Sequence, residues 1–203
     1  MKKPILTLIF LAAILVPAFA QFQANIQLGA NYTKSSSSPI NAVDTKGAYG
    51  FVFATDLRIG HRFYVQPGAY FSTSRTVYNV TDSLAVNRNR IDRYAVGAKL
   101  WAGFKIINTK YVKLRVALGP SYDYFVGTNV HDDIDFKKED FNKGSFNLDG
   151  NVGVDIWRIS FDVTYNLGLT KTFDADYFSS KPKYRQITLT VGYIIGRLGK
   201  KIL

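Results

Sequence analysis

Alternation of apolar and polar side chains, with charges on the polar side, is the feature that most constrains this chain. In YVKLRVALGPSYDYFV, residues 111–126, every even-numbered position from Val112 to Val126 is apolar or aromatic. Lys113, Arg115 and Asp123 occupy odd-numbered positions between alanine, glycine and serine. Because the side chains of a β-strand point alternately to its two faces, this pattern predicts a strand with one apolar and one polar face.

Seven further segments repeat the pattern, so the chain contains eight predicted strands of about ten residues each. A tilted strand of that length crosses a bilayer. Pro67 and Pro120 lie inside two of the segments and cannot donate to a hydrogen-bond ladder, so we expect a bulge or locally broken pairing at each. The other seven segments are residues 22–32, 49–59, 63–72, 93–104, 146–156, 159–170 and 185–194.

The connections between the predicted strands alternate between long and short. The long polar connections are residues 34–46, 75–90, 127–144 and 172–183, and the short ones lie near residues 60–61, 107–110 and 157–158. Antiparallel strands run up and down, so all long loops fall at one end and all short turns at the other. The sequence therefore predicts an all-β fold, an eight-stranded antiparallel up-and-down barrel.

Either face of such a barrel could meet water. In a soluble barrel the apolar face points inward, whereas in a membrane barrel it contacts lipid and the polar face lines the interior. Most glycines of these segments lie on the polar face, which suits a narrow interior better than a solvated surface. That face also carries charges of both signs, which can pair when buried. The predicted lumen charge network is Asp56, Arg58, Arg93, Lys99, Lys113, Arg115, Asp123, Asp149, Asp155 and Asp162.

Aromatic residues of the apolar face lie near the ends of the predicted strands. Two aromatic belts at headgroup level are typical of membrane barrels. We therefore favour a transmembrane barrel, in which closure also satisfies every backbone polar group. The aromatic residues near strand ends are Phe22, Tyr32, Tyr49, Phe104, Tyr122, Tyr124, Phe146, Phe161 and Tyr193.

The N-terminus has the pattern of a Sec-type secretory signal peptide. A basic start is followed by the apolar stretch of residues 5–16 and by Ala18-Phe19-Ala20, so we expect cleavage after Ala20. Residues 1–20 are thus the predicted signal peptide and residues 21–203 the predicted barrel domain. The chain has no cysteine and a net charge of +11. An exported basic protein can meet anionic lipid headgroups, and no nucleic-acid-binding module is present.

The chain resembles the small outer-membrane β-barrel family, in particular its PorT-like group. The segment FYVQPGAYFS, residues 63–72, is similar to the Phe-Tyr-apolar-Gln-Pro-Gly pattern of that group, and the eight-strand architecture is shared with OmpA-type and OmpX-type barrels. The resemblance implies a location in the outer membrane and insertion by the barrel-assembly machinery. That machinery usually uses a last strand ending in an aromatic residue, and the basic tail after Tyr193 departs from this pattern.

Residues able to carry catalysis are few. Without cysteine there is no thiol chemistry, and His131 with Asp132, Asp133 and Asp135 is the one cluster that could bind a divalent cation. We interpret it as a solvated acidic loop, because charged loops are usually exposed. No cofactor and no enzymatic activity are expected.

The leading hypothesis is a non-enzymatic outer-membrane barrel, plugged by its own charged side chains. It would stabilise the envelope or present its long loops to a protein partner or to outer-membrane lipids. The alternatives are a barrel enzyme acting on lipid or peptide near His131, a narrow pore, and a soluble barrel that holds an apolar ligand.

Overall fold

The computed structural model describes residues 22–36, 43–46, 48–82, 85–131, 144–170 and 183–198, which form nine β-strands. No helix long and apolar enough to cross a membrane occurs among them. The predicted signal peptide lies outside the described residues. The strands are β1 (Phe22–Ser36), β2 (Val43–Lys46), β3 (Ala48–Gly60), β4 (Phe63–Asp82), β5 (Ala85–Asn108), β6 (Val112–His131), β7 (Gly144–Ile156), β8 (Ile159–Gly168) and β9 (Lys183–Leu198).

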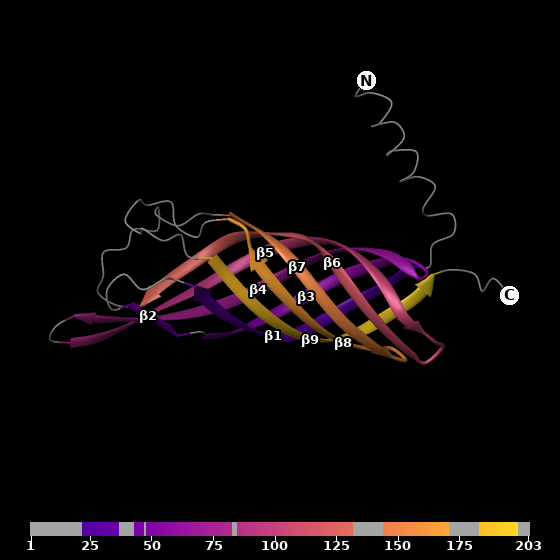
Figure 1. Cartoon of the computed structure of the whole chain (residues 1–203), viewed down its shortest axis with the longest axis horizontal. Coiled ribbons are helices and arrows are strands. Elements are labelled where there is room, and N and C mark those ends of the chain that lie inside the picture. The colour runs from indigo at the N-terminus through magenta and orange to yellow at the C-terminus, as the bar shows by residue number, and fades with distance from the viewer. Residues whose placement is uncertain are drawn as a thin grey trace, which may run out of the picture.

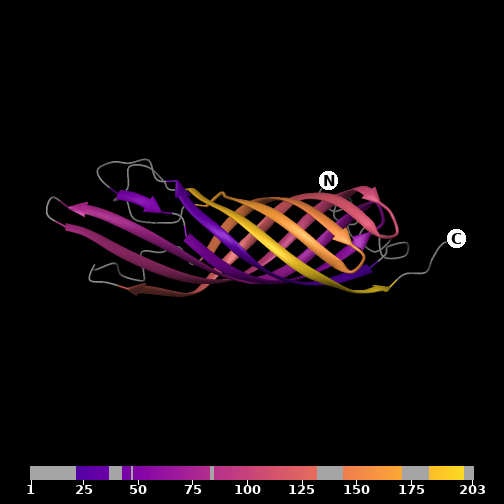
Figure 2. The same cartoon turned by 90° about the horizontal axis from the view of Figure 1, so that it is seen from below.

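Eight of these strands close into an antiparallel barrel. The sheet order is β2-β4-β3-β1-β9-β8-β7-β6-β5, and a further pairing of β4 with β5 joins the ends. β2 lies outside this ring and pairs with residues 77–80 of β4. Figures 1 and 2 show the tilted strands around one long axis, with the described chain starting and ending at the same end, where Phe22 pairs with Leu198. The predicted eight-stranded up-and-down barrel is confirmed.

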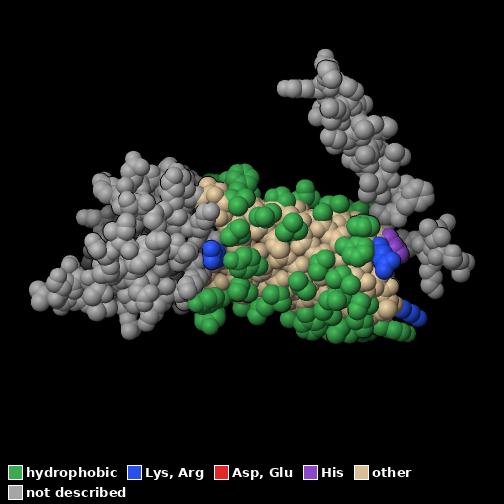
Figure 3. Space-filling view, viewed as in Figure 1, with side chains coloured by type: hydrophobic (Ala, Val, Ile, Leu, Met, Phe, Trp, Pro, Cys, Tyr) green, Lys and Arg blue, Asp and Glu red, His purple; other side chains and the backbone are tan. Residues whose placement is uncertain are grey.

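The barrel is apolar outside and polar inside. Leu118, Val163 and Leu189 are 49–59% exposed, whereas Arg115 and Asp162 are buried. Hydrophobic side chains accordingly cover the middle of the described surface in Figure 3. Water cannot be the solvent for this many exposed large apolar side chains, because soluble monomers rarely expose large continuous apolar patches. The apolar face therefore meets lipid, as predicted.

Aromatic pairs mark both edges of the apolar band. Tyr32 packs against Tyr49 at the long-connection end, with ring centroids 5.3 Å apart, and Phe63 packs against Phe104 at the short-turn end at 4.8 Å. Along β3, ten residues separate Tyr49 from Ile59. At roughly 3.3 Å per residue and a tilt of about 40°, that stretch spans about 25 Å, the height of the lipid-facing band of such barrels.

Both prolines interrupt a ladder, as predicted. Between β3 and β4 the pairs step from Asp56–Gly68 to Ile59–Val65, so the pairing is interrupted on the β3 side of Pro67. Between β5 and β6 they step from Lys99–Ser121 to Ala102–Leu118, which leaves the same interruption at Pro120. The missing N–H of proline explains both.

The predictions for several long connections are wrong in part, because the strands continue into the segments that were predicted to be loops. Residues 75–82 and 85–90 were expected to be loop but extend the β4–β5 hairpin, whose pairs run up to Asp82–Ala85. β6 likewise continues to His131, and the expected connection 34–46 contains β2. Figures 1 and 2 show this hairpin projecting beyond the other strands. Both faces of a strand beyond the bilayer can be polar, so alternation does not reveal it.

An arginine in the middle of the lipid-facing band should destabilise the barrel in a depth-dependent way. Leu118 lies halfway along β6 between Tyr124 and Val112, at the midplane of the band. Leu118→Arg should reduce the free energy of unfolding by about 2–4 kcal/mol, and Val112→Arg, at the turn end of the same strand, by about 0–1 kcal/mol. Urea unfolding in lipid vesicles measures both, and equal effects would contradict the lipid-facing assignment.

Candidate functional site in the barrel lumen

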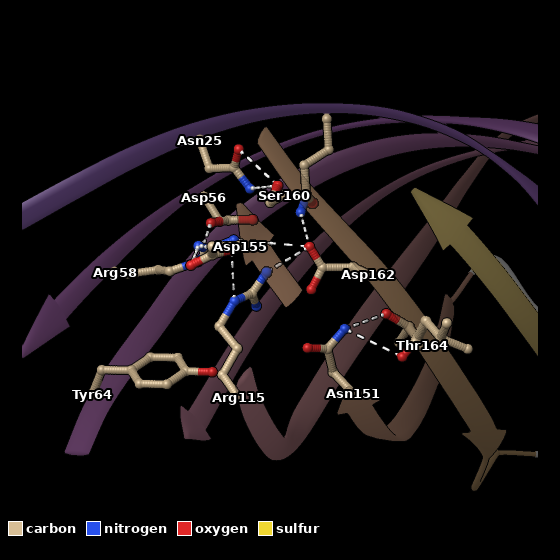
Figure 4. A network of polar contacts seen from close by, with 12 residues as sticks. Asn25, Asp56, Arg58, Tyr64, Arg115, Asn151, Asp155, Ser160, Asp162 and Thr164 are labelled. Atoms are coloured by element: carbon tan, nitrogen blue, oxygen red, sulfur yellow. Dashed lines mark hydrogen bonds and ion pairs between the residues drawn. The ribbon is translucent and has the colours of Figure 1, made fainter. Parts of the chain in front are cut away.

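Ion pairs cross the lumen in its short-turn half. The Nη1 atom of Arg58 donates to both carboxylate oxygens of Asp155 at 3.0 Å. Arg58 lies on β3 and Asp155 on β7, which are four strands apart in either direction round the ring of eight. The pair therefore joins opposite walls of the barrel, and Figure 4 shows the two side chains meeting. Successive side chains of a strand point to opposite faces, and the residues before and after Arg58 and Asp155 face lipid or the outside. Both charged side chains therefore point into the lumen.

Arg115 of β6 completes this cluster. Its Nε donates to Asp155 Oδ1 at 3.0 Å and its Nη2 to Asp162 Oδ2 at 2.8 Å. Both arginines are 0% exposed. A buried guanidinium is stable only with charged partners and good geometry. Within 4 Å, Arg115 has two carboxylates and Arg58 has three.

Gly153 makes the Arg115–Asp162 pair possible. In the sheet it stands between the two residues, opposite Arg115 on one side and Asp162 on the other. A Cβ atom at this position would lie 2.5 Å from the guanidinium carbon of Arg115 and 2.5 Å from a carboxylate oxygen of Asp162. Because Gly153 has no side chain, Arg115 and Asp162 have room to approach each other.

The network extends to neighbouring strands. Asp56 lies 3.6 Å from Arg58 Nε and 3.5 Å from Lys99 Nζ, which links β5 to the cluster. Gln27 of β1 donates to Asp162 Oδ2 at 2.9 Å. Six of the ten predicted network residues are therefore connected to one another: Asp56, Arg58, Lys99, Arg115, Asp155 and Asp162.

Two carboxylates of the predicted network, Asp149 and Asp123, lie apart from this cluster. They accept hydrogen bonds from uncharged side chains. Asp149 accepts from Trp101 Nε1 at 3.1 Å and from Asn166 Nδ2 at 2.7 Å. Asp123 accepts from the hydroxyl of Tyr70 at 2.6 Å and from an amide nitrogen of Asn147 at 2.6 Å. Both lie in the half of the lumen nearer the long connections.

A small polar cavity is lined by residues of both groups. Its volume is about 40 Å³, and its lining includes Lys99, Asp123, Asp149, Tyr70 and Trp101. One water needs roughly 10–15 Å³ of such space, so the cavity has room for a few waters.

The two remaining predicted residues lie toward opposite ends of the lumen. Arg93 is buried, with its guanidinium 3.7 Å from the ring centroid of Phe125. Lys113 is buried at the short-turn end, opposite Asp155 in the sheet.

Sequence reasoning missed several inward residues. Lys105 is 1% exposed, and its ammonium lies 5.5 Å from the ring centroid of Tyr64. Its odd number continues the inward parity of β5, but the predicted strand ended one residue earlier. Tyr64, Tyr70 and Trp101 also have the inward parity of β4 and β5, but as aromatic residues they were not included in the predicted charge network.

The predicted divalent-cation cluster lies at the edge of the described chain. His131 is the last residue of β6 rather than a loop residue, which corrects the prediction for its backbone. Asp132, Asp133 and Asp135 lie outside the described residues. In the described part of the chain, no three His, Cys, Asp or Glu side chains are grouped so that they could hold a metal ion.

Comparison with known proteins identifies the family. The model of the outer membrane protein beta-barrel domain matches residues 19–174. The chain belongs to this family. It is accordingly a β-barrel of the outer membrane, which confirms the predicted family and location.

Solved structures agree with this barrel fold. The outer membrane protein OprG from Pseudomonas aeruginosa superposes with a TM-score of 0.54 at 11% identity, covering 87% of this chain and 96% of that one. Neisserial surface protein A gives a TM-score of 0.51 at 16% identity, covering 84% and 96%. At such identities the likeness concerns the fold. No curated protein matches the sequence of this outer-membrane barrel.

The Arg115–Asp162 pair should show strong energetic coupling. Arg115→Met leaves two buried carboxylates short of a partner and should destabilise the barrel by about 3–5 kcal/mol. Combined with Asp162→Asn, the loss should be smaller than the sum of the single losses by about 0.5–3 kcal/mol. Urea unfolding of the four proteins measures this coupling.

The matched control pairs Arg115→Met with Asp149→Asn. Asp149 accepts from Trp101 and Asn166 rather than from Arg115, and it lies four positions along β7 from the residue opposite Arg115. The two losses should add to within about 0.5 kcal/mol. Additive losses for Arg115 with Asp162 would show that the pair does not stabilise the barrel.

Proposed function

We propose that this outer-membrane barrel is a non-enzymatic protein with a closed lumen, acting through its structure and the segments at its long-connection end. The observation that carries the proposal is the diametric bridge from Arg58 to Asp155, reinforced by Arg115 and Asp162. Side chains that join opposite walls leave no continuous path for solutes. An eight-stranded barrel is narrow enough to be filled in this way.

The charge balance of the lumen supports a plug rather than a pathway. Among the described residues, six buried cations face five buried carboxylates. Charges of opposite sign in nearly equal number largely cancel, which leaves little net field to draw ions through the lumen. The cations are Arg58, Arg93, Lys99, Lys105, Lys113 and Arg115, and the carboxylates are Asp56, Asp123, Asp149, Asp155 and Asp162.

The projecting hairpin supports a role in interaction. Nine residue pairs of β4 and β5, from Ser74–Arg93 to Asp82–Ala85, lie beyond the level of the Phe71–Tyr94 ring pair. They extend roughly 30 Å along the strands. β2 and the end of β6 flank this hairpin, which makes a four-stranded surface in the order β2-β4-β5-β6. In bacterial barrels the end with long connections is extracellular, where a partner can reach such a surface.

Planar-bilayer recording tests the closed lumen. The wild-type barrel should give no discrete conductance. The double variant Arg58→Ala with Arg115→Ala removes both guanidinium groups, so water should reach Asp155 and Asp162 and cation-selective steps should appear. Discrete steps in the wild type, or a silent double variant, would contradict the proposed plug.

Two controls accompany the recordings. Arg62→Ala with Lys110→Ala removes two exposed cations of the short turns and should leave the barrel closed. A shift of electrophoretic mobility on heating in detergent verifies that each variant is folded. If the double variant does not fold, adding Asp155→Asn and Asp162→Asn removes the unpaired charges and keeps the space, so conductance is still expected.

A further inference from the structure

The three short turns of the barrel share an arrangement that the closed lumen does not require. In each turn an exposed cation lies beside an aromatic ring. Arg62 Cζ lies 5.7 Å from the ring centroid of Phe104, and Lys110 Nζ lies 5.3 Å from that of Tyr111. In the third turn, Arg158 Cζ lies 5.7 Å from the ring centroid of Trp157.

The third turn is also tied to the last strand. Arg158 Nη1 donates to the hydroxyl of Tyr193 at 3.1 Å, so its guanidinium is held between two aromatic side chains. Trp157 is 70% exposed and Tyr193 48% exposed. Trp157 also has a positive φ of 56°, which a bulky residue rarely adopts, and this conformation presents its ring at the tip of the turn.

The carboxylates of this half of the barrel point the other way. Asp56, Asp155 and Asp162 are buried in the lumen with Arg58 and Arg115. Within the described residues, the outer surface of the short-turn end carries no exposed carboxylate, while His61 is exposed there as well. Figure 3 shows Lys, Arg and His side chains at this end and no acidic side chain on the described part of that face. The rim is therefore cationic and lacks internal counterions.

We propose that these turns bind the anionic headgroups of phospholipids in the periplasmic leaflet. In bacterial barrels the short turns face the periplasm. The aromatic rings place each cation at headgroup depth, where aromatic side chains prefer to lie and where a lipid phosphate is available. We call Arg62, Lys110 and Arg158, each with its aromatic neighbour, the turn cation sites.

The spacing of the turn cation sites implies that each binds a separate lipid. The turns join β3 to β4, β5 to β6 and β7 to β8, so neighbouring turns are two strands apart round the barrel. That separation is roughly 10 Å or more, comparable with the width of a lipid. Each cation therefore meets its own headgroup, and removing one should leave the others unaffected.

Quenching of Trp157 by brominated lipids tests this inference. The barrel is reconstituted in vesicles containing brominated phosphatidylglycerol or brominated phosphatidylcholine, and the relative binding constant of the two lipids at Trp157 is measured. The chain has two tryptophans, and Trp157→Phe supplies the signal of the buried Trp101 for subtraction. About 1 kcal/mol for a surface cation corresponds to a preference of about fivefold for phosphatidylglycerol at low salt.

Matched variants locate the preference. Arg158→Gln should abolish it, whereas Arg62→Gln, in a separate turn, and Arg185→Gln, an exposed cation near the long-connection end of β9, should preserve it. Salt at about 1 M should also abolish it in the wild type, since screening then acts over about 3 Å. Equal quenching by the two lipids, or a preference that survives Arg158→Gln, would overturn the proposal.

Discussion

Backbone closure is the constraint from which the rest of this barrel follows. An unpaired N–H or C=O in hydrocarbon costs several kcal/mol, so strands can cross the membrane only as a ring without edges. The β4–β5 pairing provides that closure. Once the ring is closed with apolar side chains toward lipid, eight strands leave an interior that is narrow and must be polar. The interior then has to solvate its own charges, and the Arg58–Asp155 bridge does so across the full width of the lumen.

The two halves of the lumen satisfy buried carboxylates by different chemistry. Near the short turns, guanidinium groups neutralise Asp155 and Asp162. Toward the long connections, Asp123 is held by a tyrosine hydroxyl and an asparagine amide, next to a cavity for a few waters. Ion pairs therefore occupy one half of the lumen, while the other half has room for a few waters. Directing carboxylates inward also leaves the outer rim of the turns positively charged.

The sequence predicted the strands, which side chains face outward and the polarity of the lumen. These follow from the alternation of apolar and polar residues along each strand, which is a local property. The sequence also carried the signal for Lys105, which continues the inward parity of β5. Partners across the lumen could not be predicted, since Arg58 and Asp155 are 97 residues apart and meet only through barrel closure and strand stagger. The projecting β4–β5 hairpin was missed for a different reason. Beyond the bilayer neither face needs to be apolar, so alternation fades although pairing continues.

A nitroxide scan along β6 tests the central claim, that lipid lies outside and the charged network inside. The chain has no cysteine, so a cysteine introduced at each position from 116 to 121 carries a single label. In lipid vesicles, collision with oxygen should be frequent at the even-numbered positions Val116, Leu118 and Pro120 and infrequent at positions 117, 119 and 121, giving a period of two. Frequent collision of the even-numbered labels with a water-soluble nickel chelate, or no alternation, would contradict the account.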